Sequence, residues 1–190
     1  QPTLEMAQTW SKDRFAPMLR DSPALKDLVQ DPRARSSNNT ILHKTFAGGH
    51  ITMAGANSAS SLASRPIRIV FLDEVDRFPT SAGTEGDPVS LAKKRTTTFW
   101  NRKIIMTSTP TVKGASRIEQ AFLESDQRKY YVPCPKCGEF QILMWSNIRW
   151  DQDGNQKHLP DTAHYVCAHC EYKIKEADKS RLLLGGEWRA

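Results

Sequence analysis

Residues 67–74 read IRIVFLDE, a run of large apolar residues that ends in two carboxylates. Such a run is typical of a strand buried on both faces of a parallel sheet. A second run of this kind, KIIMTS at residues 103–108, is closed by Thr109 and Pro110. Helical patterns lie between and after the two runs, at residues 89–99 and 116–125. The order strand, helix, strand, helix predicts an α/β layer structure.

Shorter elements are expected before this core. Residues 4–31 have apolar side chains at helical spacing, with a natural stop and restart at Ser22 and Pro23. Residues 33–39 are polar and predict a loop. Residues 41–44 and 50–54 predict two short strands around a Gly48–Gly49 turn. Residues 57–64 are small and polar, which fits either a loop or a short capped helix.

The carboxylates at the end of the first strand suit phosphoanhydride hydrolysis. Ligands of open parallel sheets bind beyond the carboxyl ends of the strands. Asp73 is then placed to hold Mg²⁺, usually through water, and Glu74 to activate the attacking water. Ser108 and Thr109, at the end of the second strand, are placed near the γ-phosphate, where they couple hydrolysis to movement. The alternative is an acidic turn after one strand and a proline-closed end on the other.

A phosphate-binding loop is not found in the sequence. The pattern G-x-x-x-x-G-K-[ST], whose backbone and lysine hold the β- and γ-phosphates, occurs nowhere in the 190 residues. Gly48–Gly49 and the stretch 113–116 have the wrong order and spacing. We expect that loop upstream of Gln1, in a longer protein; otherwise the site is not a nucleotidase. The 190 residues alone are therefore expected to be inactive.

Four cysteines form two C-x-x-C pairs, and 29 residues separate the pairs. Neighbouring C-x-x-C cysteines suit tetrahedral thiolate ligation better than disulfides, so Cys134, Cys137, Cys167 and Cys170 predict one structural zinc site. Four thiolates leave no open position for catalysis. The zinc would supply much of the folding free energy of residues 129–190. Trp145 and Trp150 are expected to pack this small unit; stacking on DNA is the alternative.

The net charge of +6 is unevenly distributed along the chain. Residues 1–128 carry 18 basic and 13 acidic residues, whereas residues 129–190 carry 9 and 8. Lys93, Lys94 and Arg95 form the densest basic cluster, a candidate nucleic-acid contact because Lys and Arg bind phosphates with counterion release. A solvated charged surface is the alternative. No apolar run approaches the roughly 20 residues that span a bilayer, so no membrane partner is expected.

Several segments together resemble one protein family. They are WSKDRFAPM at 10–18, SASSLASR at 58–65, DEVDRFP at 73–79, EGDPVSLAKKR at 85–95, TSTPT at 107–111, the two cysteine pairs, and GEW at 186–188. Together they are similar to the large terminase subunit of tailed bacteriophages, of the lambda-like GpA type. The combination of DEVDRFP with E-G-D-P and S-T-P is far more specific than any one motif. The resemblance covers almost the whole chain.

The resemblance implies a fold and a division of the chain. It implies a partial P-loop-type parallel sheet with flanking helices, followed by a small zinc ribbon. Residues 1–128 would be part of a packaging ATPase domain without its Walker A loop, and residues 129–190 the zinc ribbon. Asp73 would be the Walker B magnesium residue, Glu74 the catalytic carboxylate, and Ser108 and Thr109 the coupling motif.

The resemblance also implies an activity and partners. The function would be ATP hydrolysis linked to translocation of viral double-stranded DNA, with an endonuclease domain beyond Ala190. Expected partners are the small terminase subunit, the portal of the procapsid and further copies of the same subunit. The source would be a tailed phage or a prophage, and the site of action the host bacterial cytoplasm, transiently at the procapsid.

Two other interpretations stay open at this point. A DExx-type helicase has similar strand-end motifs, here Asp73 to Asp76 and Thr107 to Thr109. A helicase requires a second motor domain rich in arginine motifs, whereas a zinc ribbon follows here. A non-catalytic module that binds DNA or protein through its zinc ribbon is the second alternative.

Overall fold

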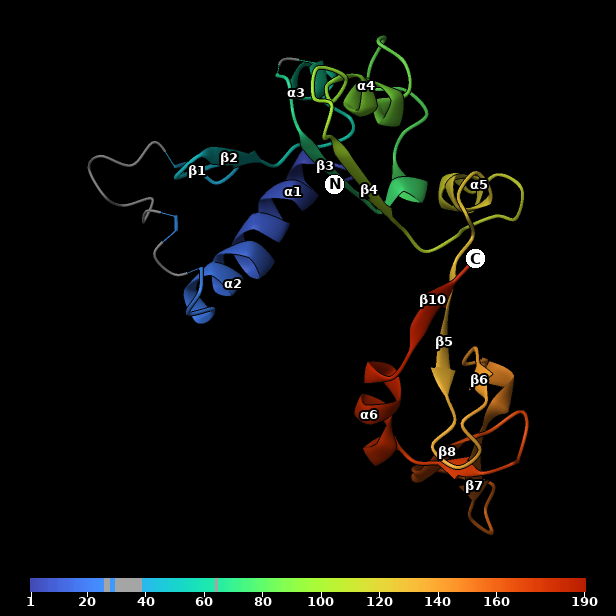
Figure 1. The fold of residues 1–190 in the computed structure, drawn as a ribbon. Coiled ribbons are helices and arrows are strands. Elements are labelled where there is room, and N and C mark those ends of the chain that lie inside the picture. Colours follow the sequence, from blue (N-terminus) through green and yellow to red (C-terminus); the bar gives the residue numbers. More distant parts are fainter. Residues whose placement is uncertain (26–27, 30–38, 64) are drawn as a thin grey trace. The chain divides into compact units, whose positions relative to one another are not determined.

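The structure, a computed structural model, describes residues 1–25, 28–29, 39–63 and 65–190 (Figure 1). The chain divides into two compact units, Gln1–Ala121 and Phe122–Ala190, each with its own core. The loop predicted at residues 33–39 lies outside the described residues except for Asn39. The helical restart predicted after Pro23 is wrong where the chain is described, because residues 23–25 and 28 form turns and Val29 forms an isolated antiparallel bridge with Phe46. No helix in the described part of the chain is long and apolar enough to cross a membrane.

The first unit begins with a continuous helical segment. It comprises α1 (Leu4–Trp10), a π-helical turn (Ser11–Phe15) and α2 (Ala16–Asp21). The hydroxyl of Thr3 caps α1 by accepting from the Met6 N–H at 3.2 Å. Pro17 has no N–H to donate to the preceding turn, and the π-helical turn accommodates this loss next to it. The predicted stop is confirmed, because α2 ends at Asp21 and Ser22 is extended.

A small hairpin follows, formed by β1 (His43–Phe46) and β2 (Gly49–Thr52). The two strands are antiparallel, and Phe46 is the register partner of Gly49. Gly48 has a φ of 84°, a left-handed conformation that glycine adopts without strain, so the predicted glycine turn is confirmed. Behind the hairpin, Met53 packs in a small core with Ala7 and Phe15 of the helical segment.

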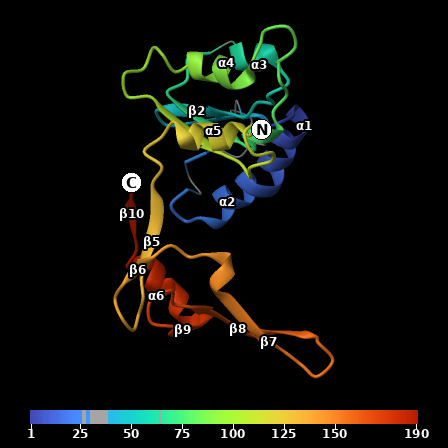
Figure 2. The same ribbon diagram turned by 90° about the vertical axis from the view of Figure 1, so that its right-hand side faces the viewer.

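The centre of the first unit is a parallel strand pair with helices on one face. β3 (Ile69–Asp73) pairs with β4 (Lys103–Thr107), and α3 (Ala59–Ala63), α4 (Pro88–Lys94) and α5 (Arg117–Leu123) complete the region. Figure 2 shows α3 beside α4 on one side of this region. Asp87 caps α4 through a 2.8 Å bond from the Ser90 N–H, and Pro88 occupies its first turn. The main core of the unit joins this helix to the strands and contains Ala56, Leu72, Val75, Phe78, Val89 and Ala92.

The two faces of the strand pair differ in burial. Val70, Leu72, Ile104 and Met106 contact the main core. On the other face, Ile69 is 40% and Phe71 71% exposed. The prediction that this strand is buried on both faces is therefore wrong for the described residues, because α3 and α4 cover only one side. The parallel pairing agrees with an α/β fold, but two strands do not define a P-loop sheet, which stays a prediction.

The second unit is built from two three-stranded sheets. One has the order β10 (Glu187–Arg189), β5 (Lys129–Pro133), β6 (Phe140–Gln141); the other is β7 (Ile148–Gln152), β8 (His158–Val166), β9 (Lys173–Ile174). All pairings are antiparallel. A short helix, α6 (Lys179–Leu184), contributes Leu182 to a core with Val132, Cys134, Cys167 and Ile174. In Figure 2 the β7–β8 hairpin projects away from the rest of this unit.

Candidate functional sites

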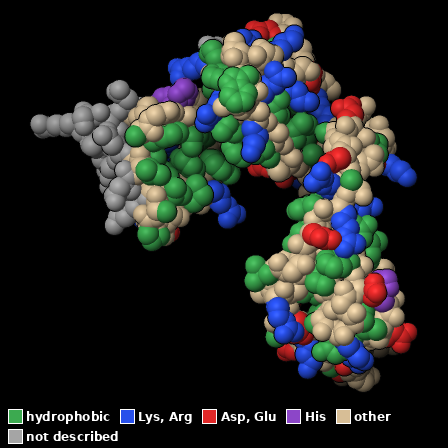
Figure 3. All heavy atoms as spheres, in the orientation of Figure 1, with side chains coloured by type: hydrophobic (Ala, Val, Ile, Leu, Met, Phe, Trp, Pro, Cys, Tyr) green, Lys and Arg blue, Asp and Glu red, His purple; other side chains and the backbone are tan. Residues whose placement is uncertain are grey.

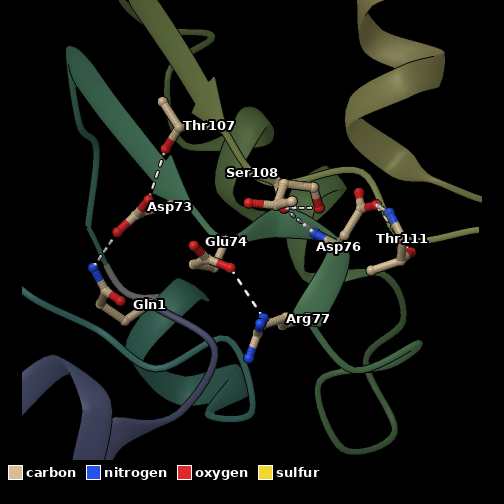
Figure 4. A network of polar contacts seen from close by, with 9 residues as sticks. Gln1, Asp73, Glu74, Asp76, Arg77, Thr107, Ser108 and Thr111 are labelled. Atoms are coloured by element: carbon tan, nitrogen blue, oxygen red, sulfur yellow. Dashed lines mark hydrogen bonds and ion pairs between the residues drawn. The ribbon is translucent and has the colours of Figure 1, made fainter. Parts of the chain in front are cut away.

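The carboxyl ends of β3 and β4 bring together Asp73 and Thr107, which are register partners. The Thr107 hydroxyl donates to Oδ1 of Asp73 at 2.7 Å, and the Gln1 amide donates to Oδ2 at 2.9 Å (Figure 4). Partial burial alone would raise the pKa of Asp73. The hydrogen bonds from Thr107 and Gln1 outweigh it and hold the pKa below its ordinary value. The carboxylate is thus ionised at neutral pH, as metal binding requires.

Glu74 has a left-handed backbone conformation, with a φ of 60°. For a residue with a Cβ this conformation costs on the order of 1–2 kcal/mol. It turns the chain sharply from β3 into the short 3₁₀ helix Val75–Arg77. The Glu74 carboxylate forms an ion pair with Nε of Arg77 at 3.1 Å, and the Arg77 side chain is 68% exposed (Figure 4). Such a solvent-exposed ion pair is weak, so it holds the Glu74 carboxylate only loosely. Strained residues of this kind concentrate at functional sites.

Asp76 connects the end of β3 to the segment after β4. Its carboxylate accepts from the N–H of Thr111 at 3.0 Å and from the N–H of Ile118 at 2.9 Å. Partial burial would raise the pKa of Asp76, but the hydroxyl of Ser116, these two N–H groups and the Thr111 hydroxyl lower it to about 2. Asp76 therefore carries a full negative charge at neutral pH and joins three segments of the chain.

The two predicted coupling residues lie in the same network. The Ser108 hydroxyl accepts from the backbone N–H of Asp76 at 3.2 Å and donates to the carbonyl of Thr109 at 3.3 Å. Asp73, Glu74 and Ser108, which were singled out from the sequence, thus lie at the same end of the strand pair (Figure 4). Thr109 directly follows Ser108 at that end. The structure brings these four together; their roles in catalysis and coupling remain proposals.

Arg117, at the start of α5, braces the loop that follows Glu74. Its guanidinium donates to the carbonyls of Phe78 at 2.8 Å, Pro79 at 2.9 Å and Val75 at 3.2 Å. It also pairs with the Asp87 carboxylate at 3.3 Å. A planar guanidinium suits this task because it presents several donors in a fixed geometry. Asp87 comes from the E-G-D-P segment, so this one side chain joins DEVDRFP to E-G-D-P.

Sequence reasoning did not identify three of these network residues, namely Thr107, Asp76 and Arg117. Thr107 and Asp76 stand inside the quoted motifs TSTPT and DEVDRFP, so the motifs themselves held a signal for them. Arg117 is a single arginine before a helix, a pattern without specific meaning. Only the fold shows that it reaches three carbonyls 38 to 42 positions earlier in the chain.

The predicted nucleic-acid residues lie elsewhere. Lys93, Lys94 and Arg95 stand at the carboxyl end of α4. The Arg95 carbonyl accepts from the N–H of Ile67 at 3.0 Å, which places this cluster beside the start of β3. The structure therefore separates it from Asp73, at the opposite end of the same strand.

The four cysteines of the second unit meet at one point, and all four sulfurs lie within 4.8 Å of one another. The Sγ atoms of Cys134 and Cys170 are 3.8 Å apart, and those of Cys137 and Cys167 are 4.0 Å apart. A tetrahedral zinc with Zn–S bonds of about 2.3 Å requires S···S distances of about 3.8 Å. A disulfide would require about 2.05 Å. The geometry thus fits a four-thiolate metal site.

Both C-x-x-C pairs sit in turns of the same form. The N–H of Gly138 donates to the Cys134 carbonyl at 2.9 Å, and the N–H of Glu171 donates to the Cys167 carbonyl at 3.1 Å. Gly138 has a φ of 76° and Glu171 a φ of 57°. Each turn therefore reverses at a left-handed residue directly after the second cysteine, which aims two thiols to the same side. Glycine suits this position, whereas Glu171 occupies it under strain.

Gln141 is a buried polar residue beside this cluster that sequence reasoning missed. Its amide Nε2 donates to Sγ of Cys167 at 3.4 Å, and its Oε1 accepts from the N–H of Ala168 at 3.0 Å. It is only 5% exposed. Residues that hydrogen-bond a metal ligand orient it and tune its donor strength. An isolated glutamine in a strand gives no signal of this role.

The packing expected of the tryptophans is wrong for Trp145, which is 77% exposed, and only partial for Trp150, which is 40% exposed. Valine, isoleucine, leucine and the cysteines themselves form the small core instead. His169, at the second cysteine pair, is exposed and is not part of the four-sulfur cluster.

Comparison with known proteins identifies the family. Residues 1–188 match the family described as "Phage terminase large subunit gpA, ATPase domain". The chain belongs to this family. The resemblance noted from DEVDRFP, E-G-D-P and S-T-P is therefore confirmed. Membership in a terminase family also favours the packaging interpretation over the helicase one.

Two relatives support the same assignment. The chain is 31% identical over 198 aligned residues to "Terminase, large subunit" of Enterobacteria phage P21, with 99% of this chain and 29% of that protein covered. It is 29% identical over 187 residues to "Terminase, large subunit" of Escherichia phage lambda, covering 93% of this chain and 28% of that protein. The chain thus spans less than a third of the length of these terminase subunits. No solved structure matches significantly.

Proposed function

We propose that this terminase chain contributes the Walker B and coupling residues to an ATP-driven motor that packages viral DNA. The observation that carries the proposal is the hydrogen-bonded network at the ends of β3 and β4. Asp73 is bonded to the strand of the coupling residues through Thr107, and Ser108 is bonded to the N–H of Asp76. A displacement of Asp73 on ATP hydrolysis would thus be passed to the segment after β4 through direct hydrogen bonds.

Each carboxylate has a distinct task in this proposal. Asp73 would hold Mg²⁺, usually through water, and the bound ion would supply charge neutralisation at the phosphates of ATP. Glu74, released from its exposed pair with Arg77, orients and deprotonates the attacking water. Asp76 does not contact substrate in this scheme. It positions the segment from Thr111 to Ile118, so that a shift at Ser108 is passed to the start of α5.

The four cysteines are proposed to hold one structural Zn²⁺. The S···S distances fit tetrahedral ligation, and four thiolates leave no position for substrate. The small core of the second unit contains only five buried residues in its described part, which supports a need for added stabilisation by metal. Residues 129–190 would thus act as a zinc ribbon, and residues 1–128 as part of the ATPase domain.

The wider setting is proposed from the terminase relatives. The partners would be double-stranded viral DNA, the small terminase subunit, the portal of the procapsid and further copies of the large subunit. The reaction would take place in the host bacterial cytoplasm, transiently at the procapsid, and an endonuclease would act in the complete protein. The competing proposal is a binding module whose strands serve as a scaffold; the strained Glu74 and the ordered Asp73 count against it.

The test is the Glu74→Gln substitution in a large subunit that contains this domain. The variant should lose ATP hydrolysis by about 10³-fold or more while ATP affinity changes little, because only the water-activating group is removed. Glu85→Gln is the matched control, since Glu85 is an exposed acid in the neighbouring loop. Wild-type ATP turnover by the Glu74→Gln variant would show that Glu74 does not activate the attacking water. The 190 residues alone are expected to show negligible turnover.

A further inference from the structure

The amino-terminal edge of the β3–β4 pair collects basic residues from three segments. Lys103 is the register partner of Ile69, and its N–H donates to the Arg68 carbonyl at 3.0 Å. The N–H of Ile67 donates to the Arg95 carbonyl, which brings the end of α4 to the same place. We call this the basic edge, and its exposed members are Arg65, Arg68, Lys93, Lys94, Arg102 and Lys103.

These positive charges are not compensated locally. The sequence has no Asp or Glu in residues 54–72 or 88–118, the segments that carry the basic edge. None of its six members forms an ion pair with any residue that the structure describes. Figure 3 shows Lys and Arg side chains gathered over α4 and the β3–β4 region. A row of unpaired cations creates a positive potential that attracts a polyanion.

The charge of the whole chain is concentrated in the same unit. Residues 1–121 carry 17 basic and 11 acidic residues, whereas residues 122–190 carry 10 of each. Within the first unit, the acids Asp73, Glu74 and Asp76 follow the carboxyl end of β3, and the basic edge lies at its other end. Five strand residues at about 3.3 Å each separate the two ends by roughly 15 Å. A polyanion at the basic edge therefore does not compete with the phosphates of ATP.

The composition of the basic edge favours a duplex. Proteins that bind single strands combine cations with several aromatic platforms on which bases stack. Here the turn before Arg102 carries Trp100, which is 95% exposed, and Phe71, which is 71% exposed, lies in the middle of β3, away from the edge. Lysines and arginines without base-reading partners contact phosphates and do so independently of sequence.

We propose that the basic edge binds the phosphate backbone of duplex DNA, at the end of the strand pair opposite the ATP site. The choice of DNA as the polyanion rests on the proposed packaging function, whereas the surface itself rests on the unpaired cations. The arrangement places nucleotide and DNA at the two ends of the same strands, so that a shift of β3 and β4 during hydrolysis is transmitted directly to the bound duplex.

The test is binding of a fluorescently labelled 30-base-pair duplex to the 190-residue chain, measured by anisotropy at several NaCl concentrations without nucleotide. The triple variant Arg68→Gln, Arg102→Gln, Lys103→Gln removes three charges from the basic edge. The control variant Lys12→Gln, Arg14→Gln, Lys157→Gln removes three exposed charges elsewhere. If the variant loses three phosphate contacts, the slope of log K against log salt falls in magnitude by about 2.7, and affinity near 0.1 M salt drops about 10- to 100-fold.

We expect the duplex affinity of the wild type to depend steeply on salt. The basic-edge variant should lose affinity and show a shallower salt dependence, and the control variant should bind with nearly wild-type affinity. An equal loss in the control, or an unchanged slope in the basic-edge variant, would overturn the proposal. So would the absence of binding by the wild type at 50 mM NaCl, or stronger competition by a single strand of equal phosphate number. If thermal unfolding shows the triple variant to be destabilised, Lys93→Gln with Lys94→Gln on the exposed end of α4 replaces it.

This test and the Glu74→Gln test fail independently. Normal hydrolysis with no duplex binding at the basic edge overturns only the DNA surface. Duplex binding that follows the basic edge, in a subunit where Glu74→Gln retains full turnover, overturns only the catalytic assignment.

Discussion

Thr107 and Asp73 face each other as register partners on two parallel strands, and a 2.7 Å hydrogen bond joins the Thr107 hydroxyl to Oδ1 of Asp73. Thr107 directly precedes the proposed coupling residues, and Asp73 is the proposed magnesium residue. The bond therefore makes the metal position depend on the position of the strand that carries the coupling residues. Conversely, a pull on Asp73 by a bound ion acts on β4 through the same hydroxyl.

Thr107→Val removes this hydroxyl at nearly constant volume. We expect the pKa of Asp73 to rise, because the bond stabilises the ionised carboxylate. The affinity for Mg²⁺–ATP in a complete subunit should fall about 3- to 10-fold, as for the loss of about 1 kcal/mol from one partly exposed bond. A carboxyl NMR titration and nucleotide binding measure the two effects. The control variant Thr107→Ser retains the hydroxyl and should behave as wild type. An unchanged Asp73 pKa in Thr107→Val would contradict the predicted role of the hydroxyl.

Arg117→Lys tests the brace on the loop after Glu74. Lysine retains the charge but loses the fork that reaches the carbonyls of Phe78 and Pro79. The Arg117 side chain is 27% exposed, and we expect the free energy of unfolding to fall by about 1–3 kcal/mol. Urea unfolding measures it. Arg102→Lys, on the exposed basic edge, is the control and should change stability little. Equal free energies of unfolding in the two variants would show that the hydrogen bonds of the Arg117 guanidinium do not stabilise the fold.

The central strands and the four-cysteine cluster were accessible from the sequence for clear physical reasons. An unbroken apolar run such as 69–72 favours a buried strand, and β4 is confirmed almost residue for residue. Cysteine spacing predicts ligation because two C-x-x-C turns together supply the four thiolates of a tetrahedral site, and the four sulfurs do meet. In both cases the signal lies in residues that are close together in the sequence, so it can be recognised without knowing the fold.

The features that escaped prediction depend on contacts between distant segments. The apolar pattern of β3 does not reveal what covers each face, and Phe71 proves to be 71% exposed. Asp76 bonds to residues 35 and 42 positions later, and no spacing rule connects them. Trp145 shows the reverse error: a large aromatic residue suggested packing, but the buried residues of the second unit's core are smaller aliphatic side chains and cysteines.

Asp76 should make the stability of the first unit sensitive to acid. Its pKa is about 2 in the folded chain against 3.8 ordinarily. Above about pH 4 the residue is ionised in both the folded and the unfolded state, and its contribution to stability is complete. As the pH falls toward 2, the unfolded state takes up the proton first, so this contribution is progressively lost.

Asp76→Asn removes that contribution, so the wild type should exceed the variant in stability at pH 7 and approach it near pH 2. Comparing the two proteins at each pH cancels any common effect of acid on the metal site. Urea unfolding at pH 7, 4 and 2.5 measures the difference. Asp161→Asn, an exposed acid in the second unit, is the control. A difference between wild type and Asp76→Asn that stays constant over this range would refute the role of the Asp76 charge.

Gln141 provides the sharpest test of the metal centre, because it contacts a ligand without being one. The bond from its amide to Sγ of Cys167 withdraws charge from that sulfur, and the bond from Ala168 fixes the turn that presents it. Gln141→Met removes both bonds at similar volume. We expect the affinity for Zn²⁺ to fall about 10- to 100-fold, the usual effect of losing a group that hydrogen-bonds a ligand.

Competition with a chromogenic chelator measures this affinity, with Gln152→Met on the exposed β7 strand as the matched control. Gln141→Glu separates the two bonds, since its carboxylate can still accept from the Ala168 N–H but no longer donates to sulfur. If the bond to sulfur matters, both Gln141 variants bind zinc more weakly, and the absorption of a Co²⁺-loaded sample shifts because the thiolate becomes a stronger donor. Wild-type affinity and an unshifted spectrum in both variants would reduce Gln141 to a packing residue and leave the four cysteines as the whole determinant of the site.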